Sequence, residues 1–142
     1  MRTMNSRIIS LYFYVILFSS CSNYDFSETV STYPTNPKPG TEVEILYFPS
    51  DSELKTADEI IATIRIYGEK DFNGKSMFTM PNNVIDTEEY SLEKTKGGWV
   101  ISVFIPDSAV GLIAVFKSGE KVDDGQGLGY PVFLQDGNGE II

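Results

Sequence analysis

Residues 99–105 (WVISVFI) and 110–117 (VGLIAVFK) decide the fold of this chain. In the first segment every second residue from Trp99 is apolar (Trp99, Ile101, Val103 and Ile105), so a strand here would present one apolar face. Pro106 and Asp107 end that segment, because proline cannot donate to a sheet ladder. The second segment is almost wholly apolar, which predicts a strand near the centre of a sheet.

Further strands are expected on both sides of this pair. Residues 42–48 (EVEILYF) open with strict polar and apolar alternation, and residues 60–67 (IIATIRIY) are rich in β-branched side chains. Residues 89–94 alternate weakly, and the turn sequence 96–98 (KGG) makes them the expected hairpin partner of 99–105. Other expected features are a loop or helical turn at 54–57, a long loop at 68–87 with a short strand at 77–80, a turn-rich loop at 118–127, a strand at 130–135 and a turn at 136–139.

Six or seven strands are therefore expected, spaced by roughly 10–15 residues, with no helix longer than one turn. An antiparallel β-sandwich is the architecture that buries such strands, so the predicted fold is an all-β, Ig-like sandwich. The term Ig-like refers to architecture alone, because the chain has a single cysteine and lacks the cysteine pair of antibody domains.

The first 22 residues have the layout of a secretory signal. Arg2 and Arg7 precede an uncharged apolar run at 8–18, and two serines separate that run from Cys21. This arrangement resembles the lipobox of bacterial lipoproteins, in which the cysteine is lipidated and becomes the new N-terminus. An uncleaved membrane anchor fits less well, because a spanning helix needs about 20 apolar residues. The alternative for Cys21 is an ordinary buried core residue.

The expected domain organisation follows from that signal. Residues 1–20 are assigned to a lipoprotein signal peptide, 21–40 to a lipidated tether, and 41–142 to the sandwich domain. The tether assignment rests on a Ser, Thr, Asn and Pro composition with little periodicity. Ser22 follows the cysteine where aspartate would favour inner-membrane retention, so the expected location is the outer membrane, facing the periplasm or the cell surface.

Composition excludes several classes of function. Arg2 and Arg7 leave with the signal, so 9 basic and 20 acidic residues remain, a formal net charge of −11. Such a surface repels phosphate backbones, so no nucleic-acid partner is expected. The chain has no histidine, and its one cysteine is assigned to lipid. These absences remove Ser-His-Asp triads, imidazole base catalysis and thiolate zinc sites, so no enzyme activity is expected.

Acidic and glycine-rich motifs offer little chemistry. Residues 123–127 (DDGQG) and 136–140 (DGNGE) have oxygen ligands at alternate positions, but they do not fit the calcium-loop spacing and suit tight turns. Carboxylate neighbours at 58–59 and 88–89 point to opposite faces of a strand. The glycines at 125, 127 and 129 precede a strand, whereas a dinucleotide motif precedes a helix. No metal and no cofactor are expected.

Aromatic side chains are the remaining binding candidates. Five of them lie at predicted strand ends or in loops, where a flat ring is able to stack on a sugar. The alternative is core packing, the commoner role of aromatic residues, and it is strongest for Trp99. The five are Tyr67, Phe72, Phe78, Trp99 and Tyr130.

Residues 37–142 resemble the N-terminal β-sandwich domain of TlpA-type thioredoxin-fold disulfide reductase lipoproteins. The resemblance rests on VEILYFP (43–49), IRIYG (64–68), GGWVISVFIP (97–106) and GLIAVFKSGEKVDDGQGLGYPVFL (111–134). It implies a non-catalytic interaction or spacer module next to a lipid anchor, with a protein partner. Because the chain has no CxxC motif, reductase activity is not implied for any residue.

The same residues also resemble starch-binding carbohydrate-binding modules. This resemblance rests on a strand ending in Tyr-Gly, a Gly-x-Trp strand ending in Pro, and an Asp-rich loop before Gly-Tyr. It implies a glycan platform at Tyr67, assisted by Phe72. The loop tryptophans typical of that family are absent. Glycan binding is thus the alternative to the protein-interaction module.

Overall fold

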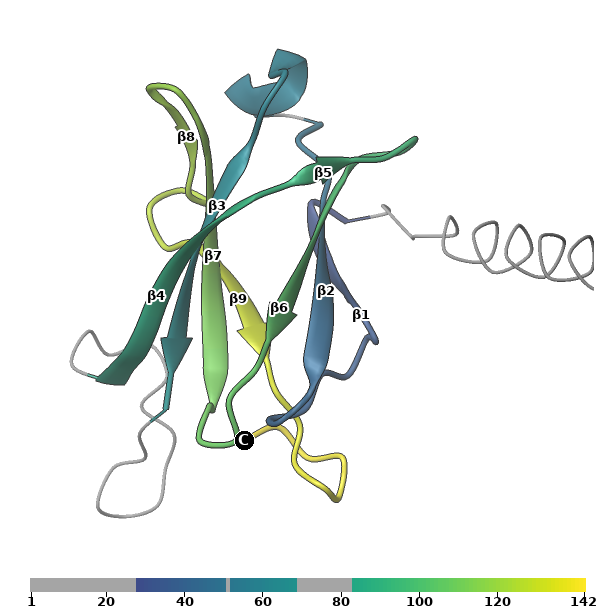
Figure 1. Cartoon of the computed structure of the whole chain (residues 1–142), viewed down its shortest axis with the longest axis vertical. Helices are drawn as coiled ribbons and strands as arrows, with labels where there is room; N and C mark the ends of the chain where they lie inside the picture. The colour runs from purple at the N-terminus through teal and green to yellow at the C-terminus, as the bar shows by residue number, and fades with distance from the viewer. Residues whose placement is uncertain (1–27, 51, 69–82) are drawn as a thin grey trace, which may run out of the picture.

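The computed structural model describes residues 28–50, 52–68 and 83–142. Two antiparallel sheets pack face to face (Figure 1). The first sheet has the order β1-β2-β6-β5 and consists of β1 (Val30–Tyr33), β2 (Glu42–Tyr47), β6 (Trp99–Phe104) and β5 (Glu93–Lys94). The second sheet has the order β4-β3-β7-β8, with β9 also paired to β7; it consists of β4 (Val84–Ser91), β3 (Ile61–Tyr67), β7 (Gly111–Ser118), β8 (Lys121–Asp123) and β9 (Tyr130–Phe133). A single 3₁₀ turn, η1 (Glu53–Thr56), completes the regular structure of the described residues.

This arrangement confirms the all-β antiparallel sandwich. The order β1-β2-β6-β5 facing β4-β3-β7-β9 follows the strand order of an Ig-like sandwich. The described residues contain nine strands, where six or seven were expected. The described residues contain no helix with the length and apolar character needed to cross a membrane.

The core lies between the two sheets and follows the alternation of the strands. β2 contributes Val43, Ile45 and Tyr47 to it, while β7 contributes Leu112 and Phe116. The ring of Tyr47 stacks on that of Phe116, with centroids 3.8 Å apart and planes 8° from parallel. This stack joins the first sheet to the second through one aromatic pair.

The sandwich begins earlier than predicted. β1 lies within the range assigned to the tether, and it pairs with β2 from Val30 opposite Tyr47 to Tyr33 opposite Glu44. The prediction was wrong here because β1 is short and none of its four residues is fully buried, so its sequence shows no apolar alternation. The nine described strands lie between Val30 and Phe133, so a chain that starts at Ser22 contains all of them.

The predicted hairpin of residues 89–94 with 99–105 is mostly wrong. β4 pairs with β3 in the second sheet, and only Glu93 and Lys94 pair with β6. The chain changes sheets at Leu92, which is buried in the core and whose N–H donates to the carbonyl of Ile60. Leu92 is the one buried residue between two mostly exposed strands, so the apolar pattern of the sequence does not show that the chain passes from one sheet to the other there.

The other predicted strands agree with β2, β3, β6, β7 and β9 within two residues, and the turn at 54–57 corresponds to η1. β7 pairs with β3 along one edge and with both β8 and β9 along the other, so its predicted central place is confirmed. The predicted loop at 118–127 contains β8. The short strand expected at 77–80 lies outside the described residues.

Candidate functional site

A cavity of about 760 Å³ opens on the outer face of the second sheet. Its floor is a row of side chains that stand side by side across four strands, because strand register places them on one line. Thr87 of β4 is opposite Arg65 of β3, Arg65 is opposite Ile113 of β7, and Ile113 is opposite Pro131 of β9. Val115 adds further apolar surface to the lining. We call this space the sheet cavity.

One wall of the sheet cavity is the glycine-rich loop 124–129 between β8 and β9. Gly129 has a φ of +75°, and a Cβ atom there would lie 2.3 Å from Cγ2 of Ile113. Only glycine therefore lets the loop lie this close to the sheet. Asp124 braces the loop internally, since its Oδ1 accepts the N–H of Gly127 at 2.9 Å. Leu128 also lines the cavity, with 82% of its surface exposed.

The loop is tied to the sandwich core through Asp123. The hydroxyl of Tyr47 donates to Asp123 Oδ2 at 2.5 Å, and the hydroxyl of Tyr130 donates to Asp123 Oδ1 at 2.8 Å. Tyr47 comes from the first sheet and Tyr130 from β9, so one carboxylate links both sheets to the residue where the loop begins. The cavity wall is thus positioned by the same contacts that hold the core together.

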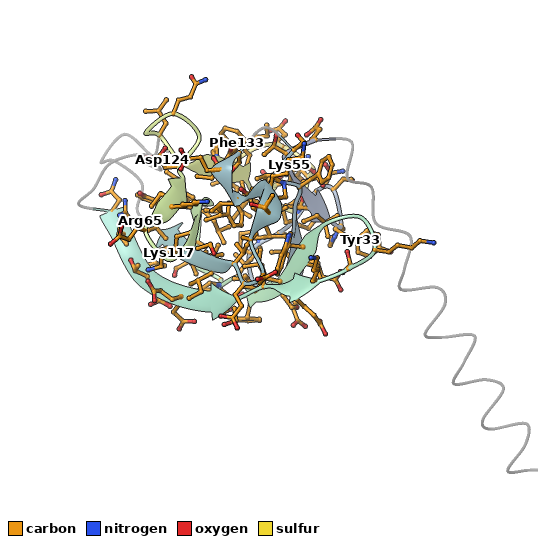
Figure 2. All side chains as sticks on the ribbon, turned by 90° about the horizontal axis from the view of Figure 1, so that it is seen from above. Tyr33, Lys55, Arg65, Lys117, Asp124 and Phe133 are labelled. Atoms are coloured by element: carbon orange, nitrogen blue, oxygen red, sulfur yellow. The ribbon has the colours of Figure 1, made fainter. Side chains whose placement is uncertain are left out.

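Arg65 is the basic residue that lines the sheet cavity, and the acidic residue of the lining, Asp124, is bonded to its own loop. In the described ranges the one ion pair joins Lys117 to Glu89, so Arg65 makes none there. Figure 2 shows Arg65, Asp124 and Lys117 on one side of the molecule and Tyr33 of the first sheet on another. An exposed guanidinium beside apolar surface is complementary to a group that carries both a carboxylate and a hydrophobic part.

Three tyrosines have raised pKa values. For Tyr47 and Tyr130, burial is the largest cause and the hydrogen bond to Asp123 comes next; both move the pKa of the phenol well above its usual range. For Tyr90, burial and the hydrogen bond to Glu88 raise the pKa to about 12. A carboxylate acceptor favours the neutral phenol, because the phenolate would repel it.

These shifts predict an alkaline loss of stability. Well below pH 10 the three phenols are neutral in both the folded and the unfolded chain, so their contribution to the free energy of unfolding does not change with pH there. Above pH 10 the unfolded chain releases protons that the folded chain keeps, so the free energy of unfolding falls as pH rises. Urea unfolding between pH 7 and pH 11 checks this, and Tyr47→Phe is expected to weaken the fall. A flat profile to pH 11, or an unchanged fall in the variant, would contradict it.

Tyr67, the described residue of the predicted glycan platform, is not presented to solvent. Tyr67 lines the sheet cavity, but only 3% of its surface is exposed, and it packs in a cluster with Val110 and Ile113. A ring buried in this way has no free face for a sugar. Phe72, Phe78 and Cys21 lie outside the described residues.

The other aromatic candidates belong to the core. Trp99 is buried in the main core cluster, and Tyr130 packs against Phe116 and donates to Asp123. Sequence reasoning missed Arg65, Leu128 and Phe133. Phe133 is 52% exposed on the outer face of β9, two residues from Pro131 in the cavity floor. The alternation of residues 130–134 carried that signal, but no pattern showed which face was outward.

The carboxylates of the acidic turns accept hydrogen bonds from backbone N–H groups of the same turns. Asp136 Oδ1 accepts the N–H groups of Asn138 and Glu140 at 2.8 and 3.0 Å, and these bonds lower the pKa of its carboxyl. Glu88 accepts from Tyr90, while Glu89 pairs with Lys117, so the two neighbours act on different groups. Among the described residues no group of three or more His, Cys, Asp or Glu side chains is placed to hold a metal ion.

The chain matches no protein-family model, no curated protein and no solved structure. The case for a functional site therefore rests on the geometry of this molecule alone.

Proposed function

We propose that the protein is a non-catalytic, lipid-anchored interaction module whose sheet cavity binds a segment of a partner protein. The segment would carry a carboxylate beside an apolar side chain. The carboxylate would pair with Arg65, and the apolar group would lie on Ile113 and Val115. The single observation that carries the proposal is an exposed arginine without an ion pair in the described residues, in register with an apolar row and walled by a braced loop.

Exposed apolar side chains around the sheet cavity support a protein partner. Leu128 and Val122 line it, and both are more than half exposed. Apolar groups gathered around one cavity are typical of interaction sites, whereas scattered ones are ordinary. Mostly apolar lining with a few charged groups, here Arg65 and Asp124, is also the usual composition of a specific pocket.

The anchoring part of the proposal rests on the sequence of residues 1–22, with Cys21 as the lipidated residue and the outer membrane as the location. Three acyl chains would hold the domain firmly, because each buried CH₂ contributes about 0.8 kcal/mol. The domain would then face the periplasm or the cell surface.

Panning a random peptide library displayed on phage against the chain from Ser22 onward tests the binding proposal. The enriched peptides are expected to combine an acidic residue with a neighbouring apolar one. Arg65→Gln is expected to weaken their binding by about tenfold or more, the effect of losing a charge-assisted hydrogen bond of about 1.5–3 kcal/mol. Lys38→Gln, at an exposed lysine outside the sheet cavity, is the matched control.

Enriched peptides without acidic residues, or equal loss in the two variants, would contradict the assignment of Arg65. A parallel pulldown on insoluble starch and a polysaccharide panel covers the glycan alternative. Retention on a polysaccharide that soluble oligosaccharide releases, with no peptide enriched, would replace the protein-interaction proposal with glycan binding.

A further inference from the structure

A second cavity, of about 320 Å³, lies at one end of the sandwich. It is lined by residues 48–50, by Lys55 of η1 and by residues 94–99 at the β5–β6 turn. The turn is closed by the N–H of Thr95, which donates to the carbonyl of Gly98 at 2.8 Å. We call it the lysine cavity, because three lysines line it: Lys55, Lys94 and Lys96.

The charge of the lysine cavity is opposite to that of the chain. The protein has 20 acidic and 11 basic residues, yet no described carboxylate lines this cavity. Glu53 of the same 3₁₀ turn lines a different cavity, together with Lys121. In the described ranges none of the three lysines makes an ion pair. Among the described residues the lysine cavity therefore has a local positive charge on a chain whose net charge is negative, and such a charge attracts anions.

The contacts inside the lysine cavity suit a phosphate group. The Nζ atom of Lys94 lies 5.5 Å from the centroid of the Trp99 ring, which holds this ammonium at the cavity wall. Gly97 and Gly98 belong to the same lining and add no side chain that would fill it. Ammonium groups on flexible stems bind phosphate as point charges.

The position of the lysine cavity points to the source of the phosphate. Phe48 lines it, and the N–H of Phe48 donates to the carbonyl of Thr29 at 2.8 Å. The described chain thus begins beside the lysine cavity, at the end of the sandwich that carries η1 and the β5–β6 turn (Figure 1). Cys21 is eight residues before Thr29, so the chain between them spans at most about 28 Å. A lipid on Cys21 keeps this end of the domain close to the membrane surface.

We propose that the lysine cavity binds the phosphate of an anionic lipid headgroup and so fixes the orientation of the domain on the membrane. This inference rests on the proposed lipid anchoring, because the anchor brings this end to the bilayer. Docking at the lysine cavity leaves the sheet cavity free, since the two share no lining residue. The acidic remainder of the surface would be held away from the same anionic headgroups.

Trp99 is the only tryptophan in the chain and lines the lysine cavity, so its fluorescence reports docking. The chain from Ser22 onward, which contains the nine described strands, is titrated with vesicles at low ionic strength. The vesicles consist of phosphatidylcholine and phosphatidylglycerol and include a lipid with a dansyl-labelled headgroup. Energy transfer from Trp99 to dansyl is expected on these vesicles and not on pure phosphatidylcholine. Because each lysine near an anionic surface changes partitioning by about fivefold, Lys96→Gln should need about five times more vesicles.

Lys38→Gln is the control, because Lys38 is equally exposed and outside the lysine cavity. Its titration is expected to match that of the parent chain. Absence of transfer on phosphatidylglycerol, or equal weakening by the two variants, would overturn the proposal. A change in Trp99 emission with inorganic phosphate alone, without transfer on vesicles, would assign the lysine cavity to a free anion and overturn the membrane contact.

The mass of the full-length protein purified from bacterial membranes tests the anchor separately. Acyl chains on Cys21 are expected, and Cys21→Ala is expected to lack them. If Cys21 carries no lipid but vesicle binding still depends on Lys96, the proposed anchoring fails and the lysine cavity stands. If Cys21 is lipidated and vesicle binding does not depend on Lys96, the anchoring stands and the lysine cavity is overturned.

Discussion

Replacing Phe116 by alanine is expected to lower the free energy of unfolding by about 3–5 kcal/mol. Phe116 is fully buried, stacks on Tyr47 of the opposite sheet and packs on Tyr130 of β9 at a centroid distance of 5.9 Å. Removing its ring leaves a cavity between the sheets and deprives both tyrosines of their packing partner. The change therefore removes an aromatic contact between the two sheets close to the residue where the loop begins.

Urea unfolding followed by Trp99 fluorescence measures this loss. Phe104→Ala is the matched control, because Phe104 is 63% exposed on the outer face of the first sheet and should change stability by less than about 0.5 kcal/mol. Phe116→Leu is expected to lie between the parent and the alanine variant, since it keeps most of the buried volume. Equal stability of Phe116→Ala and Phe104→Ala would contradict the described core.

Replacing Asp123 by alanine is expected to lower the free energy of unfolding by about 2–4 kcal/mol and to abolish binding at the sheet cavity. The substitution removes the acceptor of two part-buried tyrosine hydroxyls, those of Tyr47 and Tyr130. A buried hydroxyl left without a partner costs about 1–3 kcal/mol; Tyr130 loses its acceptor, and Tyr47 keeps only the long 3.4 Å contact with Ser52 Oγ. The loop 124–129 begins at the next residue, so its tie to the core is lost at the same time.

Two variants separate these effects. Asp124→Ala removes only the acceptor of the Gly127 N–H within the loop, so its stability loss is expected to be about 1 kcal/mol. Asp123→Asn keeps one acceptor oxygen and should give an intermediate loss. Urea unfolding gives the stability of each variant, and the peptides selected on the parent chain give its binding. If Asp123→Ala is as stable as the parent, the proposed tie between loop and core does not exist.

Much of the fold was predictable because apolar alternation is local. Trp99, Ile101 and Val103 predicted one buried face of β6, and the apolar run of β7 predicted a central strand. β1, β5 and β8 were missed or misplaced, because an edge strand of two to four residues forms only against its neighbour. Their positions depend on backbone pairing with β2, β6 and β7, and local sequence does not encode it.

The candidate sites were not predictable, because both combine residues far apart in the chain. Arg65, Ile113 and Pro131 stand in one row only because strand register aligns β3, β7 and β9. Lys55 and Lys94 line the same cavity only because η1 and the β5–β6 turn lie at the same end of the sandwich. Tyr67 was a reasonable candidate from its place at a strand end. The structure buries it, since Val110 and Ile113 pack against its ring.

Photo-crosslinking in cells tests the central claim most directly, namely that this lipid-anchored domain binds a protein through its sheet cavity. A benzophenone side chain replaces Leu128, the exposed residue of the loop, in the full chain with Cys21 intact. A protein adduct is expected from this position and is expected to disappear in Arg65→Gln, and none is expected from the same probe at Phe104. No adduct at Leu128, or equal adducts from Leu128 and Phe104, would contradict it.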